Sequence, residues 1–184
     1  GLSNLIVPAS MLNVILNRIC NLDELHKELL CKAAVIGREF DVGLLRRLTD
    51  CKDESMIAML DDAVSMQLLE KSAGKGRMVF AHDRIRDAFY HIRKEVERQK
   101  IHLEIARVIE LLNEDSKEKV IFQLAHHYIE AGDRNKILEY VLPAADKAKE
   151  SYANEEAAKL YGIALNLIKN EGLTNGKERI RIIE

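Results

Sequence analysis

Cysteine is scarce in this chain, and its few copies are spread in a way that excludes two common structural uses. The three cysteines, Cys20, Cys31 and Cys51, are widely spaced, and no Cys-x-x-Cys pair occurs. An odd number of cysteines at such spacing fits neither a disulfide framework nor a zinc site. We therefore expect three reduced thiols and, because disulfides are rare in the cytosol, a cytoplasmic location.

Long apolar runs and an excess of one charge are also missing. No apolar stretch approaches the roughly 20 residues that a bilayer-spanning helix needs. Charged residues make up 32% of the 184 residues, yet the formal net charge is only -2. Such a balance provides no field that would draw the chain to nucleic acid or to an anionic membrane, and we expect neither as a partner. The start at Gly1, which has no signal-peptide pattern, leads us to expect a piece of a longer protein.

Proline, which breaks helices most strongly, occurs only at Pro8 and Pro143. Few helices therefore need to end early, and a hydrophobic content of 47% is enough to form a core. We expect a mainly helical chain on these grounds. The helices expected in the first part of the chain span about residues 11–20, 23–35, 41–48 and 53–67.

Two short runs suited to β-strands surround a turn that contains glycine. The runs are LLEK at 68–71 and MVFAH at 78–82, and the turn between them is SAGKGR at 72–77. This pattern predicts a β-hairpin. Three helices followed by a hairpin is the arrangement of a winged-helix domain, which we expect over residues 1–94.

The second half of the chain is expected to be helical throughout. Helices are expected at about 83–92 and 95–112, followed by a linker at 113–118. Two later helices carry the residue pattern of a tetratricopeptide (TPR) repeat. The matching residues are Leu124, Ala125, Tyr128, Ala131 and Gly132 in the first helix and Ala157, Tyr161 and Ala164 in the second. We expect an antiparallel TPR-like helical superhelix over residues 95–184, the start of a longer arm.

Motifs that carry catalysis or hold a phosphate are absent from the sequence. GKGR at 74–77 lacks the spacing of the G-x4-G-K-[ST] loop, and no Ser or Thr follows its lysine. No G-x-S-x-G or H-E-x-x-H motif occurs. His126 and His127 are adjacent, so on a helix they point about 100° apart and do not easily share one metal ion. We predict no catalytic residue, no metal site and no enzyme activity in this chain.

A winged-helix domain that binds DNA inserts its third helix into the groove. The helix expected at 53–67 carries Asp53, Glu54, Asp61 and Asp62 but no lysine or arginine. Contacts between basic side chains and phosphates supply most of the affinity for nucleic acid, so DNA would repel this acidic helix. The sequence therefore does not favour DNA binding, although it stays an alternative.

FAHDRIRDAFY, at residues 80–90, places a histidine and an aspartate where an expected strand passes into a helix. Asp83 is suited to cap that helix, and Ile85 and Phe89 are suited to anchor it. Two interpretations of His82 stay open. It is either a packing residue beside the cap or an exposed imidazole that donates a hydrogen bond to a phosphate oxygen.

FAHDRIRDAFY resembles the F-x-H-x-x-I-R-x-A-x-Y stretch of the STAND-class signal-transduction ATPases, which are relatives of the AAA+ ATPases. It also resembles the Met-His-Asp motif in the winged-helix domain of apoptotic and plant immune-receptor ATPases. Four more stretches resemble segments of the STAND family in the same order. They are VPASMLNVILNRICNL (7–22), CKAAVIGREFDVGLL (31–45), LAHHYIEAGDRNKILEY (124–140) and SYANEEAAKLYGIAL (151–165).

This resemblance implies a role for the histidine. His82 would contact the β-phosphate of ADP bound in a nucleotide-binding domain and hold the winged helix in an off state. Asp83 would be its helix-capping partner in this cofactor-binding site, and Arg86 an interdomain ion-pair residue. The P-loop and the magnesium-binding aspartate of the family are absent from this chain. ADP or ATP with Mg²⁺ would therefore be bound by the longer protein.

The implied function is that of a regulatory fragment of a multidomain, nucleotide-gated signalling ATPase. Its partners would be the upstream nucleotide-binding domain of the same chain and a protein bound by the helical arm. Two alternatives stay open, a stand-alone helical interaction module and a winged-helix DNA-binding domain. A partner that binds equally well without the upstream region would favour the first, and salt-dependent binding to duplex DNA would favour the second. The sequence does not indicate the oligomeric state.

Overall fold

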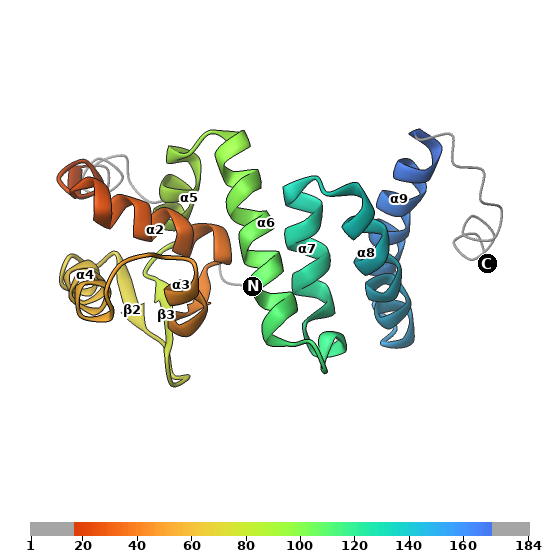
Figure 1. Ribbon diagram of the computed structural model, residues 1–184, viewed down its shortest axis with the longest axis horizontal. Coiled ribbons are helices and arrows are strands. Elements are labelled where there is room, and N and C mark those ends of the chain that lie inside the picture. The colour runs from red at the N-terminus through yellow and green to blue at the C-terminus, as the bar shows by residue number, and fades with distance from the viewer. Residues whose placement is uncertain (1–16, 171–184) are drawn as a thin grey trace, which may run out of the picture. The chain divides into compact units, whose positions relative to one another are not determined.

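Helices make up most of the structure (Figure 1). The computed structural model describes residues 17–170, where the helices are accompanied by a three-stranded antiparallel sheet. A mainly helical chain with a small hairpin, as the sequence predicts, is therefore confirmed. The helix expected at 11–20 is helical from residue 17, and its earlier part lies outside the described residues.

The chain divides into two compact units, with the division between Arg98 and Gln99. The sequence predicts a boundary between residues 94 and 95, where helix α6 (Glu95–Leu112) begins, whereas the contacts divide the chain within that helix. The assignment of the two units to a winged-helix domain and a TPR-like domain stays a prediction.

The first unit contains α2 (Glu24–Ile36), whose bounds lie within one residue of the helix expected at 23–35. The Asp23 carboxylate caps the N-terminus by accepting a hydrogen bond of 2.8 Å from the backbone N–H of His26. At the other end, the N–H of Gly37 donates to the carbonyl of Ala33 at 3.2 Å. Capping residues therefore fix both ends of this helix.

The sheet of the first unit has the strand order β1-β3-β2, with all neighbours antiparallel. Strands β2 (Leu69–Lys71) and β3 (Arg77–Phe80) form the predicted hairpin. Strand β1 (Glu39–Asp41) pairs with the other edge of β3 and places Phe40 opposite Met78. The sequence analysis does not predict β1, because three residues are too few to show an alternating pattern.

An apolar core joins the helices of the first unit to its sheet. At its centre, the ring centroids of Phe40 and Phe80 lie 5.8 Å apart, and those of Phe80 and Phe89 lie 6.1 Å apart. All three rings are at most 1% exposed, and burying each one contributes roughly 1.5–3 kcal/mol. The other helices of this unit are α3 (Val42–Arg47), α4 (Asp53–Ser65) and α5 (Asp83–Ile92).

The second unit is a succession of helices joined by short connections. After α6 come η1 (Lys117–Val120), α7 (Ile121–Ala131), α8 (Arg134–Glu150) and α9 (Asn154–Asn170). Gly132 ends α7 in the left-handed conformation, with φ at 74°. Ala144, Ala145 and Ala148 are almost fully buried in α8, and such small residues let it approach α7 and α9 closely. In the described part of the chain, no helix is long and apolar enough to cross a membrane.

A carboxylate at the end of α6 joins three helices of the second unit. The hydroxyls of Tyr128 and Tyr140 donate to Glu110, as do the ammonium groups of Lys136 at 2.9 Å and Lys117 at 3.1 Å. Partial burial by itself would raise the pKa of Glu110. These four hydrogen bonds outweigh it and lower that pKa to about 2.

Candidate functional site

His82 lies where β3 passes into α5, and its imidazole is not used to cap the helix. The residue occupies the N-cap position in an extended conformation, with φ at -144° and ψ at 148°. Its carbonyl accepts hydrogen bonds from the N–H groups of Ile85 at 3.0 Å and Arg86 at 3.3 Å. Its side chain makes no capping hydrogen bond, and the residue is exposed. The backbone of His82 therefore starts the helix, while its imidazole stays accessible.

Asp83 is not the capping residue that the sequence analysis expects. It is the first residue of α5, one position beyond the cap. Its carboxylate lies 2.9 Å from Nε of Arg38, and both side chains are more than half exposed. A carboxylate in the first turn still interacts favourably with the helix dipole. Asp83 therefore contributes charge to this corner instead of closing the helix end.

Arg86 attaches α5 to the last turn of α2. Its Nε donates a 3.0 Å hydrogen bond to the carbonyl of Ala34, and its guanidinium lies 4.9 Å from the centre of the Tyr90 ring. Carbonyls in the last turn of a helix lack partners within the helix, so this donor satisfies one of them. Both of these contacts lie within the first unit, and the interdomain ion pair that the resemblance implies for Arg86 stays a prediction.

The corner around His82 suits a phosphate group in part. An exposed imidazole can donate to a phosphate oxygen, and the start of α5 favours negative charge. Arg84 is also exposed. The carboxylate of Asp83 would repel a phosphate, but Arg38 offsets its charge. The phosphate contact that the resemblance implies for His82 stays a prediction, and Asp83 lies beside it as the partner of Arg38.

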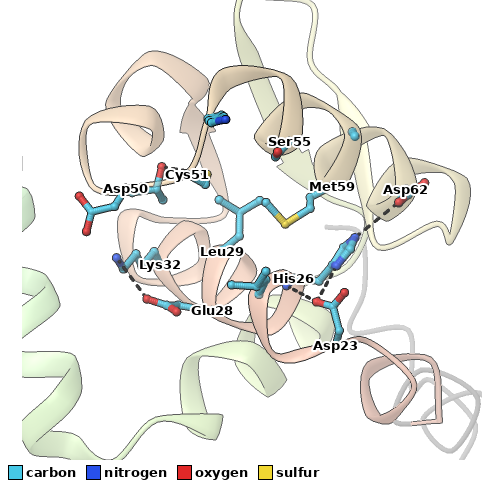
Figure 2. A pocket seen from close by; sticks show the side chains of 14 residues that line it. Asp23, His26, Glu28, Leu29, Lys32, Asp50, Cys51, Ser55, Met59 and Asp62 are labelled. Atoms are coloured by element: carbon cyan, nitrogen blue, oxygen red, sulfur yellow. Dashed lines mark hydrogen bonds and ion pairs between the residues drawn. The ribbon is translucent and has the colours of Figure 1, made fainter.

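A cavity of about 690 Å³ lies between α2 and α4, and no sequence motif points to it (Figure 2). At one end, Nδ1 of His26 lies 2.8 Å from Asp23 and Nε2 lies 3.5 Å from Asp62. Hydrogen bonds from the backbone and then from the ring of His26 lower the pKa of Asp23. On the opposite side, Lys32 donates to the carbonyl of Leu48 at 2.7 Å. The contact of His26 with Asp62 links α2 to α4, and the hydrogen bond of Lys32 links α2 to the end of α3.

The three cysteines differ in how far they are buried. All three are free thiols, with Cys20 exposed, Cys51 partly buried and Cys31 buried. Burial raises the pKa of the Cys31 thiol, so the reactive thiolate is disfavoured. The free state agrees with the reduced thiols expected from the sequence.

Helix α4, the expected groove-reading helix, exposes its acidic residues. Asp53, Glu54, Asp61 and Asp62 are all exposed. The guanidinium of Arg46 pairs with Asp53 at 2.5 Å, so part of the nearby positive charge is already neutralised. This surface is poorly suited to a phosphate backbone.

Three histidines of the second unit lie together, which the sequence analysis missed. The sequence predicts no shared metal ion for His126 and His127, because adjacent residues on a helix point apart. A third histidine, His102, comes from α6, and its Nδ1 lies 2.9 Å from Nδ1 of His127. Burial first, and then the neighbouring His102 and His126, lower the pKa of His127 from 6.5 to about 3. A pattern did exist, because His102 shares the buried face of α6 with Ile105 and Ile109. A histidine on such a face is usually a core residue, so the spacing alone did not indicate a cluster.

Comparisons with known proteins give no identification. No protein-family model, no curated protein and no solved structure matches this chain. The resemblance to the STAND-class ATPases therefore rests on the sequence stretches alone and stays a hypothesis.

Proposed function

We propose that this chain is a regulatory segment of a nucleotide-gated signalling ATPase in the cytoplasm. Its first unit would act as a winged-helix domain, and its second unit as a TPR-like arm that binds a protein partner. The observation that carries the proposal is His82, an exposed imidazole at a strand-to-helix corner that is used neither for capping nor in the core. A side chain in that position is available to a ligand held by another domain.

The order of elements in the first unit supports the winged-helix part of the proposal. A helix, a short strand, two helices and a hairpin follow one another, and the first strand pairs with the last. Winged-helix domains have this order. In the second unit, α7 with α8 and α8 with α9 pack as successive helix pairs through small residues, as TPR-like arrays do.

This chain would contribute one hydrogen bond to ADP, from the imidazole of His82, and the helix that carries this residue is held firmly in place. His82 stands at the start of α5, which Ile85 and Phe89 anchor in the core and Arg86 ties to α2. Nucleotide and Mg²⁺ would be held by residues outside this chain, and ADP would favour the state in which His82 reaches it. A ligand shifts such a switch only through its different affinities for the two states. The hydrogen bond from His82 supplies part of that difference.

The test is ADP release from a longer protein that includes the nucleotide-binding domain. His82→Ala should speed ADP release and raise basal activity, because a charge-assisted hydrogen bond contributes about 1.5–3 kcal/mol. That energy corresponds to roughly a tenfold to hundredfold faster release. His91→Ala is the matched control, because His91 is exposed near the other end of α5. An unchanged ADP release rate in His82→Ala would refute the proposal.

A second candidate function is a helical interaction module without nucleotide control. Exposed apolar side chains at the end of α6 and the start of α7 favour it, since Leu111 is 70%, Leu112 47% and Phe122 42% exposed. A partner that binds the isolated chain and the longer protein equally well, whatever the nucleotide, would support this alternative.

A further inference from the structure

The histidine cluster of the second unit brings three ring nitrogens together from two helices. His102 comes from α6, and His126 and His127 come from α7. One ring nitrogen from each residue lies within 4.8 Å of the other two. The ring of His102 contacts both partners, with centroid distances of 5.8 Å to His126 and 5.1 Å to His127. The rings of His126 and His127 are also close, with centroids 5.1 Å apart, so the three rings form one cluster.

We propose that His102, His126 and His127 form a binding site for one divalent transition-metal ion such as Zn²⁺. Imidazole nitrogen is a preferred ligand of Zn²⁺, Cu²⁺ and Ni²⁺, whereas Mg²⁺ and Ca²⁺ prefer oxygen. A carboxylate is not among the three ligands, so the site would select for metals that bind nitrogen.

The distances suit a small tetrahedral ion after minor side-chain rotation. Zn²⁺ binds nitrogen at about 2.0–2.1 Å, which places the nitrogens of a tetrahedral site about 3.3 Å apart. The Nδ1 atoms of His102 and His127 are 2.9 Å apart, close to this value. In that contact one ring donates a hydrogen to the other. A metal ion would take the place of that shared hydrogen, and the donor ring would carry its hydrogen on Nε2 instead of Nδ1.

Burial and exposure divide the site into a fixed part and an entrance. His102 is 1% exposed and His127 is 3% exposed, so the surrounding core fixes both rings. His126 is exposed and gives an ion a route from solvent. Three protein nitrogens would leave a fourth coordination position for water, a pattern known from open zinc sites. The bound ion would connect α6 to α7.

The experiment is a metal titration of the chain, prepared without a polyhistidine tag and freed of metal with a chelator. Calorimetry with Zn²⁺ should give one site per chain, and Zn²⁺ should raise Tm. Co²⁺ should give the strong visible absorption of tetrahedral coordination. In NMR spectra, Zn²⁺ should shift the ring signals of the three clustered histidines and leave those of His26, His82 and His91 in place.

The decisive variant is His126→Ala, because His126 is exposed and its removal leaves no cavity in the core. This variant should bind Zn²⁺ at least about tenfold more weakly, because even the mutation of a residue that only hydrogen-bonds to a metal ligand lowers metal affinity by that factor. His91→Ala, an exposed histidine of the first unit, should bind Zn²⁺ like the unaltered chain. The absence of saturable binding, or an equal loss in both variants, would overturn the site. The cluster would then be a buried hydrogen-bonded histidine pair with an exposed neighbour.

Discussion

The second unit contains two glycines, Gly132 and Gly162, whose backbone conformations differ. Gly132 ends α7 with φ at 74°, in the left-handed region that glycine adopts without strain. Gly162 lies inside α9, where φ is not positive. A Cβ atom added at either position would meet nothing within 4 Å. Only the backbone conformation therefore distinguishes the two sites.

Alanine at these two positions should change stability in opposite directions. Gly132→Ala should destabilise the chain by about 1–2 kcal/mol, because a Cβ is strained in the left-handed conformation. Gly162→Ala should stabilise it by about 0.5–1 kcal/mol, because glycine weakens a helix interior relative to alanine. Urea unfolding of both variants measures the two changes. Shifts of the same sign would mean that contacts, not conformation, govern one of these sites.

The cap of α5 shows why a single residue is hard to assign from sequence. Aspartate is a favoured N-cap and histidine is not, so propensity selects Asp83. In the structure His82 is the N-cap, and Asp83 is the first helical residue and pairs with Arg38. Arg38 lies far from Asp83 in the sequence, so the capping preferences of neighbouring residues do not predict this ion pair.

The contact between α5 and α2 includes one hydrogen bond to a buried carbonyl, in addition to apolar packing. Ala34 is 0% exposed, and its carbonyl accepts from Nε of Arg86. Arg86→Ala should destabilise the chain by about 1–3 kcal/mol, because that carbonyl would be left buried without its donor. Arg84→Ala is the control, since Arg84 is exposed on the same helix and should change stability by less than about 0.5 kcal/mol. Thermal or urea unfolding compares them, and equal effects would contradict the role given to Arg86.

Elements with strong local patterns were predicted well, and those formed by distant pairing were not. The hairpin of β2 and β3 follows from two β-competent runs around a turn, and α2 lies within one residue of the helix expected at 23–35. Strand β1 has three residues and forms only because β3 offers a free edge. The histidine cluster is similar, because α6 and α7 must pack before His102 meets His127.

The ion pairs of Arg38, Arg46 and Glu110 differ in exposure between the two units of the chain. In the first unit, exposed ion pairs such as Arg38 with Asp83 and Arg46 with Asp53 lie at the surface, where each contributes about 0–1 kcal/mol. In the second unit, Glu110 is only 19% exposed and is bound by two hydroxyls and two ammonium groups. The pH dependence of stability should therefore depend more on this carboxylate than on any one of those surface pairs.

Glu110 binds a proton less readily in the folded chain than in the unfolded chain. Its pKa falls from 4.5 to about 2 on folding, despite the opposing effect of partial burial. The folded state therefore gains stability from this group above the unfolded pKa of about 4.5, and loses it as pH falls from there toward 2. The full contribution is about 3 kcal/mol at neutral pH.

Glu110→Gln should remove most of this pH-dependent stability while keeping the size of the side chain. At pH 7 the variant should be less stable than the unaltered chain by about 2–3 kcal/mol. Below about pH 4.5 the difference should shrink by up to about 1.4 kcal/mol per pH unit, because protonation removes the same charge from the unaltered chain. Urea unfolding between pH 7 and pH 3 measures it, with Glu104→Gln, an exposed position on α6, as the control. A constant difference across this pH range would mean that Glu110 acts by packing and hydrogen-bond geometry, not by its charge.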